Sequence, residues 1–166
     1  MLILGVDPGT RHLGWGVVRA EGSRMTCEGC GVANPSPSLP LSGRLVLIDE
    51  ALGGVLRMYG PEESAVETLF FAKDAQAASK LGHARGGVLL VLAKAGLPIH
   101  EYEPARVKRA VTGRGRAEKT QVAMMVKAIL GLREVPAADA ADALAVAITH
   151  AYFARVDRAM RAASLR

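Results

Sequence analysis

The stretch MLILGVDPGT, residues 1–10, decides the fold. Leucine, isoleucine and valine fill most of residues 2–6, as in a buried strand, and the carboxylate of Asp7 follows them directly. Pro8 and Gly9 then predict a turn. A carboxylate at the end of a buried strand is costly unless another group neutralises its charge. The group that neutralises Asp7 is therefore expected to indicate the function.

Strand and helix patterns alternate along the rest of the chain. Further strands are expected over residues 13–18, 25–32, 64–67 and 98–102. Helices are expected over residues 41–59, 74–95, 103–111, 117–130 and 137–161. A helix between two strands is typical of a parallel crossover. The order of elements predicts an α/β fold with a mixed sheet flanked by helices.

The chain has 166 residues, of which 50% are hydrophobic and 22% are charged, as in an ordinary globular protein. We expect one domain over residues 1–155 and a basic C-terminal tail over 156–166, either disordered or a continuation of the last helix. No targeting segment or membrane-spanning run is evident, which predicts a cytoplasmic protein. The net charge of +5 favours polyanionic partners, chiefly nucleic acid.

Cys27 and Cys30 form a single CxxC pattern. One such pair provides two ligands, whereas a structural zinc site takes four. On a regular strand, residues three apart point to opposite faces, so two thiols without a metal are expected. The spacing of the four histidines does not indicate catalysis. A supporting role for His150, two turns beyond Asp142, stays open.

Four acids lie where they could share a metal ion. Glu67, like Asp7, comes late in a predicted strand, and Asp139 and Asp142 share one face near the start of the last helix. Carboxylates that converge raise each other's pKa and need a cation. Oxygen ligands suit Mg²⁺ or Mn²⁺, and two such ions about 4 Å apart support phosphodiester hydrolysis. Taken alone, each acid fits an ordinary structural position, such as that of Asp139 near a helix N-terminus.

Residues 106–119 form a basic stretch that contains one acid, Glu118. Its cations are Arg106, Lys108, Arg109, Arg114, Arg116 and Lys119. Glycines flank Arg114, so the backbone there can approach another surface closely. Cations on such a loop match phosphate contacts, and the alternative is a solvated basic loop. A basic surface beside an acidic site is what a nuclease requires.

Phe70 and Phe71 follow shortly after Glu67. Their side chains would point to opposite sides of an extended segment, so one ring could be exposed beside the acids. An exposed ring can stack on an unpaired base. Two core phenylalanines are the alternative.

Four stretches resemble the RuvC family of Holliday-junction resolvases, in the family's order and over nearly the whole chain. They are GVDPGT (5–10) with GWGVV (14–18), VETLFFAKDAQAASKLGHARG (66–86), EYEPARVKRAVTGRGRAEKTQV (101–122) and ADAADALAVAITHA (138–151). The resemblance implies an RNase H-like fold, with a five-stranded mixed sheet and helices on both faces. It implies a homodimer that nicks two opposed strands of four-way junction DNA, in recombination and repair.

The resemblance also implies roles for particular residues. The family's catalytic, metal-binding carboxylates fall on Asp7, Glu67, Asp139 and Asp142, with two Mg²⁺ ions per site and Mn²⁺ as a substitute. The family's base-stacking aromatic falls on Phe70, and its DNA-binding lysines fall on Lys108 and Lys119. A branch-migration helicase complex of the RuvA–RuvB type is implied as a partner.

Other functions remain to be separated from this one. The opening VDPGTRHLG (6–14) also resembles nucleases that process ribosomal RNA precursors. A non-catalytic junction-binding module is a second alternative. An actin-like ATPase would need two such lobes, and this chain has room for one. For the dimer surface we expect the alanine-rich helix over 74–95, around Ala84, because small residues let helices approach closely.

Overall fold

The computed structural model describes residues 1–68 and 75–164. The strands are Leu2–Asp7 (β1), Leu13–Glu21 (β2), Arg24–Ala33 (β3), Glu63–Glu67 (β4) and Ile99–Tyr102 (β5). The helices are Leu41–Tyr59 (α1), Ala75–Lys94 (α2), Pro104–Thr112 (α3), Lys119–Leu130 (α4) and Ala138–Ser164 (α5). Each element has the type expected from the sequence, and the helix over 41–59 has the expected ends.

Two helix ends differ from expectation by two residues or more, and the other differences are of one residue. α4 begins two residues later than expected, because Glu118 and Gln121 form a capping box. The Gln121 side-chain oxygen accepts a hydrogen bond from the backbone N–H of Glu118 at 3.1 Å. α5 continues to Ser164, so most of the expected tail is helical here. The domain division at residue 155 stays a prediction.

The strands form one mixed sheet in the order β3-β2-β1-β4-β5. β1 pairs antiparallel with β2, and β2 pairs antiparallel with β3. β1 pairs parallel with β4, and β4 pairs parallel with β5. The carboxyl ends of β1, β4 and β5 therefore lie at the same edge of the sheet.

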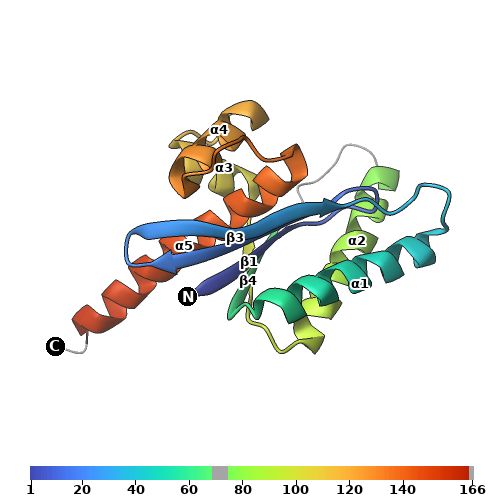
Figure 1. The fold of residues 1–166 in the computed structure, drawn as a ribbon, viewed down its shortest axis with the longest axis horizontal. Helices are drawn as coiled ribbons and strands as arrows, with labels where there is room; N and C mark the ends of the chain where they lie inside the picture. Colours follow the sequence, from blue (N-terminus) through green and yellow to red (C-terminus); the bar gives the residue numbers. More distant parts are fainter. Residues whose placement is uncertain (69–74, 165–166) are drawn as a thin grey trace.

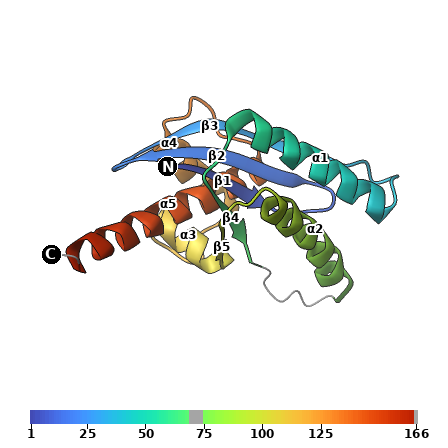
Figure 2. The ribbon, with the colours of Figure 1, turned by 90° about the horizontal axis from the view of Figure 1, so that it is seen from below.

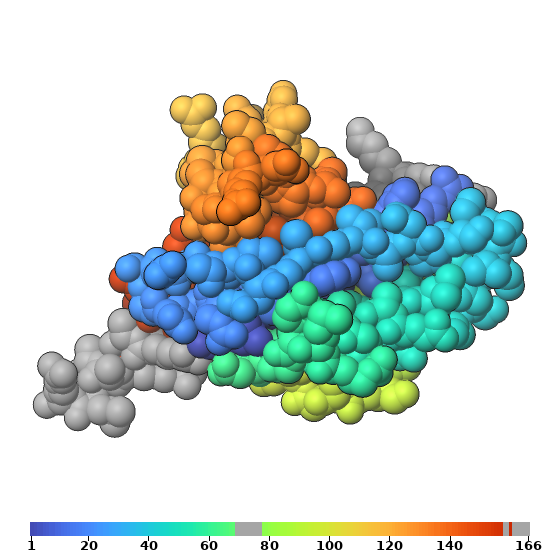
Figure 3. All heavy atoms as spheres, in the orientation of Figure 1, coloured from blue at the N-terminus to red at the C-terminus, as the bar shows by residue number. Residues whose placement is uncertain are grey.

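Helices cover both faces of the sheet, as expected. α1 and α2 lie on one face, and α5 crosses the other with α3 and α4 beside it (Figures 1 and 2). The alternation along β1 fits these layers, since Leu4 and Val6 join the core under α1 and α2. Ile3 joins the core under α5. In the space-filling view, α3 and α4 form a raised lobe beside the strands (Figure 3).

α5 lies unusually close to the sheet. A Cβ atom added to Gly5 would overlap the carbonyl oxygen of Ala143, and one added to Gly14 would overlap that of Asp139. The strand backbone at these glycines therefore touches the helix backbone, which no residue with a side chain would allow. This close approach brings the first turns of α5 to the sheet edge where β1 ends.

A β-bulge changes the direction of the CxxC side chains. The register between β2 and β3 shifts between Val17 and Val18, and Glu28 is the additional residue. As a result Cys27 and Cys30 both pack against the core cluster under α5, close enough for each thiol to shift the pKa of the other. The expectation that they point to opposite faces is wrong. Both cysteines are free.

The expected role of Ala84 is also wrong. Its side chain has 0% exposure and lies in the core between α2 and the sheet, so it cannot contact a second copy. Other positions of α2 are outward-facing, including Leu90, which is 61% exposed. In the part of the chain that the structure describes, none of the helices combines the length and apolar character needed to cross a membrane.

Candidate active site

The ends of two neighbouring parallel strands carry the first two acids. Val6 pairs with Val66, so Asp7 and Glu67, the next residues, lie side by side at the end of β1 and β4. Asp7 shares the face of Ile3, and Glu67 shares the face of Ala65; both of these residues belong to the core under α5. Both carboxylates therefore point to the face that α5 covers.

α5 brings the other two acids to the same place. Asp139 lies in its first turn, where negative charge is favourable, and its backbone touches Gly14, which pairs with Asp7. Asp142 follows three residues later on the same side of the helix. The structure thus brings together the four acids that the sequence indicated as candidate metal ligands.

Three of these acids line a pocket of about 180 Å³. Asp7, Glu67 and Asp142 line it together with two lysines, Lys108 from α3 and Lys119 from α4. Nζ of Lys119 lies 2.6 Å from Oδ2 of Asp142. Lys119 is held there because it is the first residue of α4, directly after the Glu118 cap. The pocket is therefore lined by more carboxylates than cations, and the two lysines balance part of their charge.

Burial and mutual repulsion change the pKa of two acids. Burial, with added repulsion from Glu67, Asp142 and Asp139, raises the pKa of Asp7 to about 7. Burial, with repulsion from Asp142, raises the pKa of Glu67 to about 7. Lys119 lowers both values, and its own pKa is raised by the hydrogen bond to Asp142. The folded protein therefore favours protonation of these carboxyls unless a further cation binds.

We expect the metal-free protein to lose stability as the pH rises from about 5 to about 8. Asp7 and Glu67 have folded pKa values of about 7, whereas unfolded carboxyls titrate near pH 4. The folded state therefore binds more protons between these values, so its stabilisation is complete below about pH 4 and disappears through about pH 7. Urea unfolding should show a fall on the order of 3–5 kcal/mol.

The double variant Asp7→Asn, Glu67→Gln is the control for this prediction. It lacks both titrating groups, so its unfolding free energy should vary much less over the same pH range. Added Mg²⁺ should restore the stability of the unsubstituted protein at pH 8. An unsubstituted protein that gains stability towards pH 8 without metal would contradict the charge repulsion.

The donor set fits a hard divalent cation. The described residues that line the pocket offer carboxylate oxygens and no histidine or cysteine ligand. Such oxygen ligands suit Mg²⁺ or Mn²⁺. A bound cation would also offset the repulsion that raises the two pKa values. The residues present therefore match the metal chemistry expected from the sequence.

The basic residues lie on the lobe beside the pocket. Arg106, Arg109, Arg114 and Arg116 are exposed on α3 and the following loop, and Lys108 is half-buried at the pocket. The guanidinium of Arg106 lies 3.9 Å from the ring centre of Phe153, so part of its cationic surface is already in contact within the chain. Phe70 and Phe71 lie outside the described residues.

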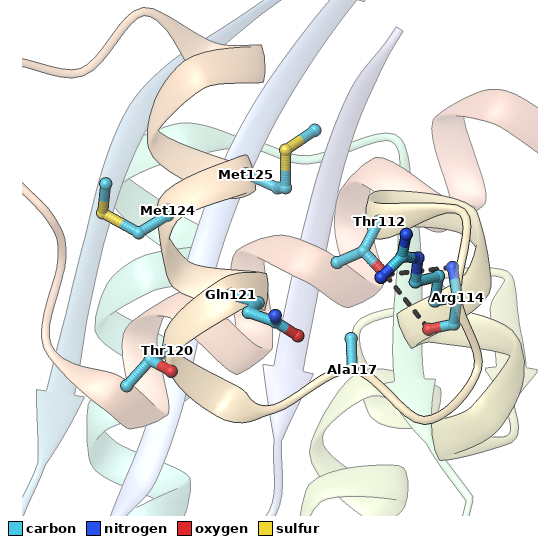
Figure 4. A pocket seen from close by; sticks show the side chains of 7 residues that line it. All are labelled: Thr112, Arg114, Ala117, Thr120, Gln121, Met124 and Met125. Atoms are coloured by element: carbon cyan, nitrogen blue, oxygen red, sulfur yellow. Dashed lines mark hydrogen bonds between the residues drawn. The ribbon is translucent and has the colours of Figure 1, made fainter.

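A larger pocket of about 490 Å³ lies between the basic loop and α4. Figure 4 shows Arg114 on one side and Met124 and Met125 on the other. The Thr112 hydroxyl accepts from the backbone N–H of Arg114 at 3.1 Å, and its proton can be donated either to the Lys108 carbonyl at 2.8 Å or to the Arg114 carbonyl at 3.0 Å. These bonds give the loop a defined backbone, which is more order than the glycines suggested.

One group of ionisable side chains was not predicted from the sequence. Glu63 lies at the start of β4, and His100 and His150 meet it from β5 and α5. A signal was available, because Glu63 precedes Glu67 by four residues on one strand and His150 follows Asp142 by eight on one helix. At these spacings, Glu63 and Glu67 lie on one face of the strand, and Asp142 and His150 lie on one side of the helix. The group therefore lies between the same two elements as the acids.

Comparison with known proteins identifies the family. The family model for the crossover junction endodeoxyribonuclease RuvC matches residues 3–150. The RuvC protein of Sorangium cellulosum is 56% identical over 150 residues, which cover 90% of this chain and 84% of the relative. The RuvC protein of Rhodopseudomonas palustris is 52% identical, with coverage of 90% and 86%.

Solved structures agree with this result. Thermus thermophilus RuvC in complex with its Holliday junction substrate superimposes with a TM-score of 0.89 at 42% identity, over 95% of this chain and 96% of that one. The yeast mitochondrial resolvase Ydc2 shares the fold, with a TM-score of 0.66 at 15% identity over 94% of this chain and 80% of that one. These neighbours confirm the expected RNase H-like fold. The chain belongs to the RuvC family of crossover junction endodeoxyribonucleases.

Proposed function

We propose that this protein is an endonuclease that resolves Holliday junctions by paired, symmetric nicks in two strands of like polarity. The observation that carries the proposal is the convergence of Asp7, Glu67 and Asp142 on one pocket, with Asp139 beside them. The substrate, four-way junction DNA, is inferred from the family relationship. The pocket supplies the chemistry, because clustered carboxylates bind the divalent ions used in phosphodiester hydrolysis.

The four acids would hold two Mg²⁺ ions, for which Mn²⁺ can substitute. Bound ions supply an activated water molecule and stabilise the charge that develops on the scissile phosphate. Asp7 and Glu67 are fixed by the sheet, and Asp139 and Asp142 by α5, so the ligands are positioned before substrate binds. Lys108 and Lys119 would attract the phosphate and keep the acids ionised.

Cleavage of defined substrates tests this proposal. With Mg²⁺, the protein should nick a synthetic four-way DNA junction at two symmetric positions and leave ends that ligase seals. A structured RNA of similar size serves as the competing substrate. Preference for the RNA would favour the ribosomal RNA nuclease alternative. Junction binding without nicking would favour the non-catalytic module.

Lys119→Met should lower the cleavage rate and move its pH dependence to higher pH. The Lys119 charge lowers the pKa of both Asp7 and Glu67, so its loss leaves these acids protonated to a higher pH. We expect a rate about tenfold lower at pH 7, with partial recovery at pH 8.5. Single-turnover junction cleavage from pH 6 to 9 measures this. Lys94→Met, at the exposed end of α2, is the matched control. An unchanged pH dependence of the cleavage rate would show that Lys119 does not control the ionisation of the acids.

The exposed cations of α3 and the following loop form the proposed phosphate-contacting surface: Arg106, Arg109, Arg114 and Arg116. This surface borders the pocket through Lys108 and Lys119, so DNA held on it would place one phosphate at the acids. Contacts of this type give affinity without reading sequence. Stacking of Phe70, and a contribution from Phe71, on an unpaired base remains a prediction from the sequence.

We propose a homodimer because two opposed DNA strands of the junction must be cut, and each subunit carries one site. Two identical sites related by a twofold axis match the twofold symmetry of a junction. On α2, Gly82, Gly86 and Leu90 recur every four residues, and a Cβ on either glycine would meet no atom within 4 Å. Glycine weakens a helix interior, by roughly 1 kcal/mol relative to alanine, and is useful there if another chain approaches closely. We therefore place the dimer contact on this stripe.

Leu90→Glu should convert the dimer to a monomer. Its side chain is 61% exposed in the single chain, so the substitution leaves the fold intact but buries a charge in the proposed contact. Sedimentation velocity should show the smaller species at micromolar concentration, with an unchanged circular dichroism spectrum. Met124→Glu, at a position 58% exposed on α4, is the control. A Leu90→Glu protein that stays dimeric would place the contact elsewhere.

The remaining expectations follow from this function. A resolvase acts on junctions that a branch-migration complex moves, so a RuvA–RuvB type assembly is the proposed partner. A location in the cytoplasm, predicted from the sequence, is part of the same proposal.

A further inference from the structure

A second group of potential metal ligands lies at the start of β4, four residues before Glu67, and near the middle of α5. Oε2 of Glu63 is 2.6 Å from Nε2 of His150 and 3.2 Å from Nε2 of His100. One ligand atom from each of the three residues lies within 4.8 Å of the others. Three donors this close together can coordinate a single ion.

The surroundings of His150 select the nitrogen that would bind. The Tyr102 hydroxyl is 2.7 Å from Nδ1 of His150, which leaves Nε2 directed at Glu63. Metal-bound histidines commonly have such a partner on the second ring nitrogen, which fixes the ring and its tautomer. With a metal on Nε2, the Nδ1–H donates to the Tyr102 oxygen. His150 is therefore oriented by a group that is not itself a ligand.

The group also has room and access for an ion. A cavity of about 250 Å³ is lined by the three residues, and also by Tyr102 and Asp157. The side chain of His150 is 3% exposed and that of His100 is 40% exposed, so one ligand is fixed in the interior and the other borders solvent. An ion could enter past His100 and complete its coordination with water.

The site is separate from the acid pocket. Glu63 and Glu67 are the first and last residues of β4, about 13 Å apart along the strand. His150 lies eight residues beyond Asp142 on α5, about 12 Å along the helix axis. Its chemistry differs too, because two imidazoles and one carboxylate favour Zn²⁺ and related transition metals over Mg²⁺.

We propose that Glu63, His100 and His150 form a binding site for a divalent transition-metal ion of the Zn²⁺ class. The ion would join β4, β5 and α5 to one another at the end remote from the acids. Since β4 and α5 also carry Glu67, Asp139 and Asp142, the bound ion would stabilise the relative positions of the two elements that carry these acids. An ion-pair network between Glu63 and protonated histidines, with no metal, is the competing account.

Zinc binding by the full-length protein tests the proposal. Zn²⁺ is titrated into the protein against a chromophoric chelator, and visible absorption of added Co²⁺ gives a second readout. The unsubstituted protein should bind one ion here and melt at a higher temperature when Zn²⁺ is present. His100→Gln, at the exposed ligand, should weaken binding at least about tenfold, and Tyr102→Phe should weaken it by about tenfold.

Two controls locate the bound ion. His12→Gln removes an exposed histidine outside the group and should leave zinc affinity unchanged. Asp7→Asn alters the acid pocket and should also keep zinc bound. Full zinc affinity in both His100→Gln and Glu63→Gln, or loss of binding in Asp7→Asn, would overturn the proposal. Absence of zinc or cobalt binding by the unsubstituted protein would favour the ion-pair network instead.

Discussion

Asp7→Asn should abolish junction nicking while leaving the protein folded and able to bind DNA. The substitution keeps the size of the side chain but removes a charged ligand at the centre of the acid group. Metal ions contribute several kcal/mol to the stabilisation of such a transition state, so we expect a rate at least about 10³-fold lower. Single-turnover cleavage of a labelled four-way junction in Mg²⁺ measures the loss.

The Asp7→Asn substitution should affect junction binding much less than junction cleavage. Phosphate contacts from the basic surface dominate affinity, so junction binding without metal should stay within about threefold of the unsubstituted value. Urea unfolding at pH 8 should show equal or greater stability, because burial of an ionised carboxylate is relieved at Asp7. Asp49→Asn changes an exposed acid on α1, on the other face of the sheet, and is the control. Normal nicking by Asp7→Asn would refute the catalytic assignment.

Gly14→Ala should reduce both stability and cleavage, although it adds a single methyl group and removes none of the proposed metal ligands. The new Cβ would overlap the Asp139 carbonyl oxygen and lie 3.2 Å from the Asp139 Cβ. Both obstacles belong to the start of α5, so the helix must move away from the sheet. Overpacking of this kind costs about 1–3 kcal/mol.

The displaced helix carries Asp139 and Asp142 away from Asp7 and Glu67. A misplacement of about 1 Å can cost about 100-fold in rate, so we expect a fall of this order in a protein that is still folded at 25 °C. Gly54→Ala is the matched control, because a Cβ there meets no atom within 4 Å and alanine favours the helix. Unchanged stability and rate in Gly14→Ala would show that the close approach does not position the acids.

Much of the fold and of the acid group could be predicted from the sequence. The strand over residues 2–7 and the helix over 41–59 follow from the period of their apolar residues, which depends on local backbone geometry. The position of Asp7 at a strand end follows from the same pattern. The spacing of the four acids indicated that they could share a metal but also allowed separate positions, and the family resemblance favoured the shared site.

The tertiary structure decided what depends on contacts between elements. Gly14 allows α5 to touch β2, and a bulge at Glu28 turns Cys27 and Cys30 to one face. Local patterns do not encode these effects, because they depend on register and on the distance between backbones. The meeting of Glu63, His100 and His150 has the same origin. By itself the sequence determined which helices and strands form and which acids lie near their ends. The packing of α5 on the sheet determined which side chains meet.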